Sequence, residues 1–214
     1  ISCTSSSSTS STTSTDNTTV LFVGVGSSGT IHTSSDGTTL DTRTSGTTAS
    51  LFGVTYGNST FVTVGDNGTI LTSSDGTTWT SRTSNTSKNL YGVIYGNSTF
   101  VTVGDSGTIL TSSDGTSWDN RTSSTKNSLA GLTFGNSTFV TMGGSGTILT
   151  SSDGTSWTSR TSGASDTLWG VIYGKSAFVV VGTLGTVLTS SDLTTWTSRT
   201  SNTSNNLLEV TYKE

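Results

Sequence analysis

From Leu51 onward, the sequence repeats with a period of 39 residues, without insertion or deletion. The first two copies are identical at 29 of 39 positions, counted from Leu51 and from Leu90. A fixed period of this length is typical of repeat architectures, in which each repeat is one supersecondary unit. Near-identical units leave few positions for the unique residues that catalysis needs. The repeat therefore predicts a shape much more directly than it predicts an activity. The copies begin at Leu51, Leu90, Leu129, Leu168 and Leu207.

The two ends of the chain share one further repeat between them. Residues 20–50 align with the repeat but lack its first segment, because TTSTDNTT precedes Val20 where the other copies have a segment such as LFGVTY. Residues 207–212 read LLEVTY and supply that first segment alone. Four full copies and one divided copy make five units, and this division predicts that the array closes into a ring.

Each copy contains four short segments rich in β-branched and aromatic residues, at 51–56, 60–64, 69–73 and 78–83 in the first copy. Clusters of Gly, Asn, Asp and Ser separate them, which indicates strands joined by hairpins. No window has apolar residues at helical spacing. Four antiparallel strands in about 40 residues is the size of one propeller blade. We predict an all-β fold, a five-bladed β-propeller of 39-residue, four-stranded blades. In it, residues 207–212 complete the N-terminal blade formed by residues 20–44.

A motif in the third turn resembles a known family. Ser73-x-Asp75-Gly76-x-Thr78-Trp79 resembles the Asp-box, or bacterial neuraminidase repeat, whose usual form is S-x-D-x-G-x-T-W. The whole unit is similar to bacterial propellers of the sialidase-like and photosystem II stability-factor-like group. This sequence is one residue shorter between Asp and Trp, and Leu193 replaces the glycine of the last copy. The resemblance implies that the motif is a structural hairpin on the outer strands. Its members are Asp36, Asp75, Asp114, Asp153, Asp192, Trp79, Trp118, Trp157 and Trp196.

Composition excludes several classes of function. Only 10% of residues are charged, the net charge is −4 and no basic cluster occurs, so nucleic acid is a poor partner. No apolar run is long enough for a membrane span. We expect no cofactor, no metal site and no enzymatic activity, because the one histidine, His32, has no partners for a triad or a metal cluster. All arginines fall at one repeat position and cannot converge, which leaves a sialidase-type glycoside hydrolase as a remote alternative. They are Arg43, Arg82, Arg121, Arg160 and Arg199.

Candidate ligand-binding residues lie where the copies differ. The second position of the first strand is Phe52, Tyr91, Ala130, Trp169 or Leu208. The aromatic members could stack on sugar rings, and the competing interpretation is a core position that tolerates apolar exchange. Glu209 replaces the glycine found at Gly53 and its equivalents. It either faces the central channel or marks the seam of the ring.

Residues 1–19 are rich in Ser and Thr and have almost no apolar content, so we predict a disordered tail or linker ahead of a propeller at 20–214. Cys3 is the only cysteine and could assemble or anchor the protein, as an intermolecular disulfide or a lipid anchor. N-x-S/T sequons are compatible with glycosylation. Our first hypothesis is a non-catalytic, extracellular or cell-surface bacterial structural protein. Its propellers would self-associate through the N-terminal tail into a fibre or layer. The alternative is a multivalent carbohydrate-binding lectin or adhesin tethered to the cell envelope.

Overall fold

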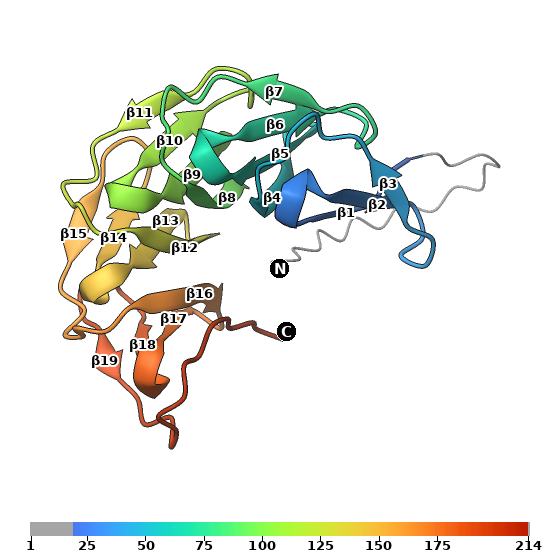
Figure 1. Ribbon diagram of the computed structural model, residues 1–214. Helices are drawn as coiled ribbons and strands as arrows, with labels where there is room; N and C mark the ends of the chain where they lie inside the picture. The colour runs from blue at the N-terminus through green and yellow to red at the C-terminus, as the bar shows by residue number, and fades with distance from the viewer. Residues whose placement is uncertain (1–18, 214) are drawn as a thin grey trace.

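In a computed structural model, residues 19–213 are described, and they form nineteen strands in five antiparallel sheets. The sheets follow one another in sequence around an arc (Figure 1). The first sheet contains β1 (Phe22–Val25), β2 (Ile31–Ser34) and β3 (Asp41–Arg43). The second sheet contains β4 (Leu51–Gly57), β5 (Thr60–Gly65), β6 (Ile70–Ser73) and β7 (Thr80–Arg82). The third sheet contains β8 (Leu90–Gly96), β9 (Thr99–Gly104), β10 (Ile109–Ser112) and β11 (Asp119–Arg121). The fourth sheet contains β12 (Leu129–Gly135), β13 (Thr138–Gly143), β14 (Ile148–Ser151) and β15 (Thr158–Arg160). The fifth is β16 (Leu168–Gly174), β17 (Ala177–Gly182), β18 (Val187–Ser190) and β19 (Thr197–Ser198).

Each complete sheet is a meander in which the first strand of the copy lies innermost (Figure 1). In the second sheet, Gly57 pairs with Thr60, so Asn58 and Ser59 form a two-residue hairpin loop, with φ of 46° and 56°. Positive φ at both positions is what the type I′ turn of a tight hairpin requires. The second and third strands are joined by a one-turn 3₁₀ helix, in which Asn67 has φ 55° and Gly68 has φ 71°. Turn chemistry therefore sets the length and register of every sheet.

The core consists of contacts between successive sheets rather than a single centre. We call the side of a sheet that meets the next sheet along the chain its outgoing face, which in the second sheet carries Val62, Val64 and Ile70. The opposite side is the incoming face, which in the third sheet carries Leu90, Phe100 and Leu110. The two faces pack together into one buried cluster, and equivalent clusters join the other neighbouring sheets.

Glycines bring neighbouring inner strands into close contact. A Cβ atom on Gly57 would lie 2.1 Å from Cγ of Tyr95, on the inner strand of the next sheet. The same position in the fifth sheet is Gly174, where a Cβ atom would lie 2.2 Å from Cγ of Tyr212. The backbone N–H of Leu207 also donates to the carbonyl of Gly182 at 2.9 Å. Residues 207–212 thus lie against β16 where the inner strand of a sixth sheet would lie.

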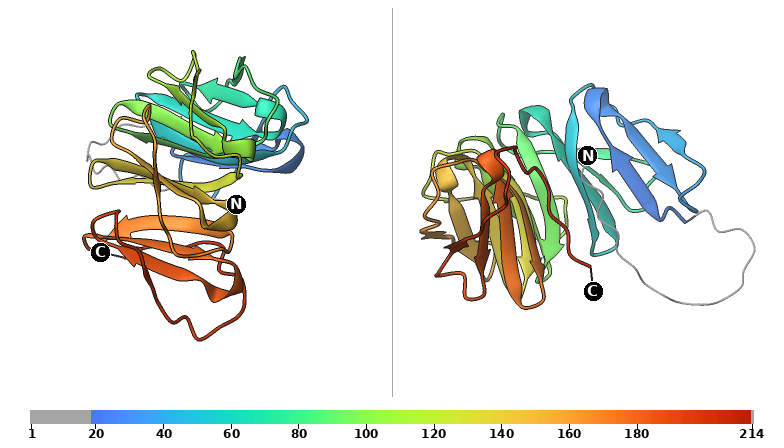
Figure 2. Two further views of the ribbon diagram at one scale, coloured as in Figure 1. Left: turned by 90° about the vertical axis from the view of Figure 1, so that its left-hand side faces the viewer. Right: turned by 90° about the horizontal axis from the view of Figure 1, so that it is seen from below.

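The all-β architecture of five sheets agrees with the predicted propeller, but the predicted ring closure is not present in the described residues. The first sheet has three strands, β1 pairs with β2 alone, and no strand is assigned to residues 207–212. Figures 1 and 2 show the two ends of the arc separated by an opening. Four of the five sheets have the predicted four strands.

Candidate functional site

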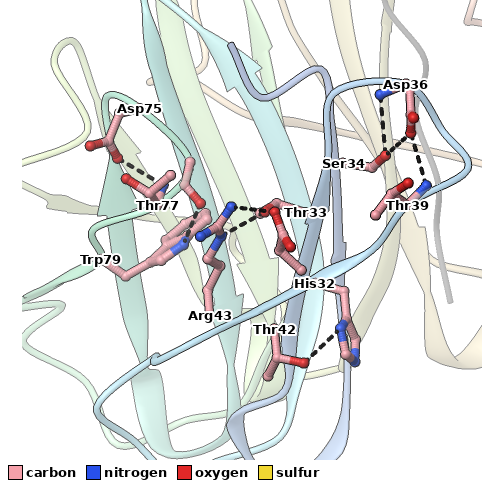
Figure 3. A network of polar contacts seen from close by, with 12 residues as sticks. His32, Thr33, Ser34, Asp36, Thr39, Thr42, Arg43, Asp75, Thr77 and Trp79 are labelled. Atoms are coloured by element: carbon pink, nitrogen blue, oxygen red, sulfur yellow. Dashed lines mark hydrogen bonds and ion pairs between the residues drawn. The ribbon is translucent and has the colours of Figure 1, made fainter. Parts of the chain in front are cut away.

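The repeated polar motif forms a closed network within each sheet. In the second sheet, Asp75 Oδ1 accepts hydrogen bonds from the backbone N–H groups of Thr77 (2.8 Å) and Thr78 (2.9 Å). Ser73 Oγ donates to Asp75 Oδ1 at 2.9 Å and accepts from the N–H of Gly76 at 2.8 Å. Figure 3 shows the equivalent group of the first sheet, Ser34, Asp36 and Thr39. The carboxylate is therefore surrounded by donors of its own turn.

These donors lower the pKa of all five motif aspartates well below the usual range of a carboxyl group. For Asp75 the largest cause is the hydrogen bond from the N–H of Thr78, followed by the hydroxyl and N–H of Thr77. Hydrogen bonds to the charged form stabilise it, so each carboxylate stays ionised to unusually low pH. Such a group is a poor general acid at neutral pH.

The motif tryptophans close the same turn, with one exception. The indole N–H of Trp79 donates to the carbonyl of Gly76 at 3.1 Å, and Trp118 and Trp157 make the equivalent bonds. In the fifth sheet, the indole nitrogen of Trp196 is buried without a hydrogen-bond partner. This is the copy in which Leu193 stands in place of the glycine, with φ 62°.

The arginines are also used within their own sheets. Nε of Arg82 donates to Oγ1 of Thr72 at 2.8 Å, and the other four arginines bond the equivalent threonine at 2.7 to 2.9 Å. Each arginine lies on or next to the outermost strand of a separate sheet. Arg43 and Arg121 add ion pairs to Asp41 and Asp119. A set of three arginines around one carboxylate is therefore not formed.

The variable aromatic residues lie at the start of the inner strands, where the ladder with the second strand shifts register. The rings of Phe52 and Tyr91 are neighbours, with centroids 5.6 Å apart and planes tilted by 48°. The hydroxyl of Tyr91 donates to Asp105 Oδ1 at 2.9 Å, and Oγ of Ser128 donates to the same atom at 2.8 Å. Burial raises the pKa of Tyr91, and the bond to Asp105 adds to this effect. We call Phe52, Tyr91 and Asp105 the rim group.

The remaining predicted site residues do not join the rim group. Trp169 is 40% exposed on the fifth sheet, two copies along the chain from Tyr91. Glu209 lies at the free end of the arc, where its Cα would be 2.9 Å from a Cβ atom on Gly170. Its carboxylate accepts a 3.4 Å bond from the N–H of Val210. His32 Nδ1 lies 3.3 Å from Oγ1 of Thr42 on β3 (Figure 3). Cys3 lies outside the described residues.

Sequence reasoning missed two features of the described residues. The bond between Tyr91 and Asp105 joins two positions that differ between copies, and neither position predicts the other as its partner. Phe22 and Leu40 are 45% and 65% exposed, although residues 20–50 align with the repeat. Among residues 19–213, no three His, Cys, Asp or Glu side chains gather in a way that could hold a metal ion, and no helix is suited to crossing a bilayer.

Four-stranded antiparallel meanders stacked face to face around an arc define a β-propeller. Solved structures with this fold resemble the chain. The structure "YCF48 bound to D1 peptide" has a TM-score of 0.66 at 18% identity. The match covers 86% of this chain, but this chain spans only 64% of the length of the YCF48 chain. YCF48 from Cyanidioschyzon merolae has a TM-score of 0.64 at 16% identity, and the match covers 86% of this chain and 69% of the YCF48 chain. A GH74 enzyme from Niastella koreensis has a TM-score of 0.50 at 18% identity, and the match covers 84% of this chain and 30% of the enzyme chain. Neither family models nor curated proteins give a match.

Proposed function

We propose that this chain is a non-catalytic structural protein, the propeller subunit of a bacterial surface fibre or layer in which residues 1–19 link neighbouring copies. The observation that supports this function most directly is that the repeated polar residues make hydrogen bonds within their own turns and sheets. The five motif aspartates are bonded within their own turns, and the five arginines are bonded to threonines of their own sheets. Side chains used in this way build the propeller and are not presented to a substrate.

The surface composition is compatible with this proposal. Ser and Thr make up 92 of 214 residues, and charged residues make up 10%. Short hydroxyl side chains have little conformational entropy to lose when copies pack together, in contrast to Lys and Glu. An N-terminal Ser/Thr segment can add to the open edge of a neighbouring sheet, because an extended strand satisfies the backbone groups of that edge.

Electron microscopy of the purified full chain tests this function. We expect fibres or layers from the full chain, and dispersed short particles from a variant that lacks residues 1–19. A Cys3→Ser variant is the matched control, because it keeps the whole segment and removes only the thiol. Fibres that persist unchanged without residues 1–19 would refute the tail as the link. A full chain that is dispersed at all concentrations would refute the structural function.

The rim group favours a second candidate function, that of a multivalent lectin or adhesin held at the cell envelope through Cys3. Phe52 is 37% exposed and lies against Tyr91, and Asp105 offers a second carboxylate oxygen for a sugar hydroxyl. Titration calorimetry with monosaccharides at millimolar concentration checks this function. We expect binding that is lost in Phe52→Ala and retained in Leu208→Ala, since Leu208 is an exposed residue of the same repeat position. Heat of dilution alone, for every sugar, would contradict it.

A further inference from the structure

The two ends of the arc expose opposite halves of the interface that joins its internal sheets. On the outgoing face, Val62, Val101 and Val140 are completely buried. The equivalent residue of the fifth sheet, Val179, is only half-buried, and so is Val187, whose equivalents Ile70, Ile109 and Ile148 are completely buried. In the part of the chain that the structure describes, no further sheet packs on the outgoing face of the fifth sheet, although Val181, at the position of Val64, is buried.

The first sheet has the complementary deficiency on its incoming face. Phe22 is 45% exposed, although the equivalent phenylalanines of the other sheets are at most 9% exposed. Leu40, at the position of Trp118, is 65% exposed, whereas Trp118 is 4% exposed. His32 takes the position of Leu71 and Leu110, which are buried. This end exposes the incoming face that an outgoing face packs against elsewhere in the arc.

The backbone is complementary in the same way. Among the described residues the first sheet has no inner strand, so the inner edge of β1 has no ladder partner there. Residues 207–212 lie in the position of an inner strand and have no second strand. In the complete sheets, the inner-strand aromatic packs on the phenylalanine of the second strand, as in Tyr95 with Phe100 at 4.6 Å. At the equivalent positions, Tyr212 is 43% exposed and Phe22 is 45% exposed.

We propose that the two ends bind each other between copies: residues 207–212 of one chain pair with β1 of a second copy, and the outgoing face of the fifth sheet packs on the incoming face of that copy's first sheet. The register is that of β4 with β5, so Thr211 lies opposite Val23 and Tyr212 opposite Phe22. This contact is separate from residues 1–19, but it deepens the proposed self-association and rests on it.

A second copy fits these ends better than the first chain's own opposite end. From the second sheet onward, each inner strand contacts the next inner segment through the same glycine and aromatic pair, at Gly57, Gly96, Gly135 and Gly174, so these four steps share the same tight packing. The arc built in this way is open (Figure 1). Closing it would disturb every one of these contacts, whereas adding a copy preserves them. The contact is heterologous, so repeated addition builds an open assembly, in which copies are displaced along the axis.

Disulfide trapping in the full chain tests the pairing. In a Cys3→Ser background, Val23→Cys and Thr211→Cys lie opposite each other in the proposed register, at the Cβ separation that a disulfide can bridge. Mild oxidation should give a ladder of covalent multimers on a non-reducing gel. Thr42→Cys with Thr211→Cys is the matched control, because Thr42 lies on the outer strand β3, away from the proposed pairing, and it should give at least tenfold less multimer.

Three outcomes overturn the proposal: a monomer with an internal disulfide, which would mean that the chain closes its own ring; free thiols throughout; and a ladder of equal intensity in the control. Two further variants, measured by light scattering, support or contradict the face contact. Phe22→Ser should weaken association at least tenfold, and His32→Leu, which restores the residue of the other sheets, should strengthen it several-fold. Fibres that still form in Phe22→Ser would refute this contact and leave the tail-linked function intact.

Discussion

The most informative single perturbation removes the same side chain at two equivalent positions. Phe100 and Phe22 occupy one repeat position, and differ because Phe100 lies in a complete sheet between two neighbours. Phe100 is completely buried, 4.6 Å from the ring of Tyr95 and 6.4 Å from that of Trp118. Phe22 is 45% exposed and lies in the sheet that lacks an inner strand. Comparing the two variants therefore measures how much a neighbouring sheet and an inner strand contribute to the free energy of unfolding.

The expected losses of unfolding free energy differ about fourfold to fivefold. Replacing a completely buried Phe by Ala costs about 3–5 kcal/mol, and the two ring contacts place Phe100→Ala in the upper half of that range. Complete burial of a Phe side chain is worth roughly 1.5–3 kcal/mol. Since nearly half of Phe22 stays in water and no sealed cavity forms, Phe22→Ala should cost only about 1 kcal/mol.

Urea unfolding followed by tryptophan fluorescence measures both values, at a protein concentration low enough to avoid association. The stability of a repeat array is roughly a sum over its units and their interfaces, so the loss at Phe22 should appear as early unfolding of the first sheet. Equal losses of unfolding free energy in the two variants would refute the open arc, because they would mean that Phe22 is as well covered as Phe100.

Three further predictions concern the turns. Ser73→Ala removes the acceptor of the Gly76 N–H and should cost roughly 1–2 kcal/mol in urea unfolding, whereas an unchanged midpoint would mean that water replaces the hydroxyl. Leu184 is 65% exposed with φ 53°, where other copies have Ser or Asn, so Leu184→Asn should stabilise the protein by about 0.5–1 kcal/mol; a lower melting temperature would contradict this. The motif aspartates have lowered pKa values, so their contribution is complete above the ordinary value of 3.8 and is lost as the pH falls below it. Melting temperatures measured from about pH 5 to about pH 2.5 should fall steeply, and a flat profile would contradict the assignment.

Much of the fold follows from periodicity. The segments predicted at 51–56 and 60–64 correspond to β4 and β5, because alternating β-favouring residues between Gly and Asn clusters have few other folded states. The count of five sheets follows equally directly from the 39-residue spacing. Closure does not follow from the count, because the angle between sheets is set by contacts such as that of Gly57 with Tyr95. Those contacts recur at the same position of successive copies, but the period in the sequence does not indicate the angle at which they hold neighbouring sheets.

The candidate sites were less predictable for the same reason. Phe52 and Tyr91 stand out as variable positions in an otherwise uniform repeat, and the structure brings their rings together. The partnership of Tyr91 with Asp105 depends on the register shift at the start of β8, which alternation of residue types does not indicate. The exposure of Phe22 follows from the missing inner strand of the first sheet, and the sequence around Phe22 gives no sign of it.

Sedimentation equilibrium of the full chain over a wide range of concentration tests most directly whether this propeller is an open arc with complementary ends. We predict that the mean mass rises continuously with concentration and passes beyond that of a dimer, because a heterologous contact leaves one free end of each kind on every assembly. In Phe22→Ser the rise should shift to at least tenfold higher concentration. A single species of monomer mass at every concentration would contradict both the open ends and the structural function.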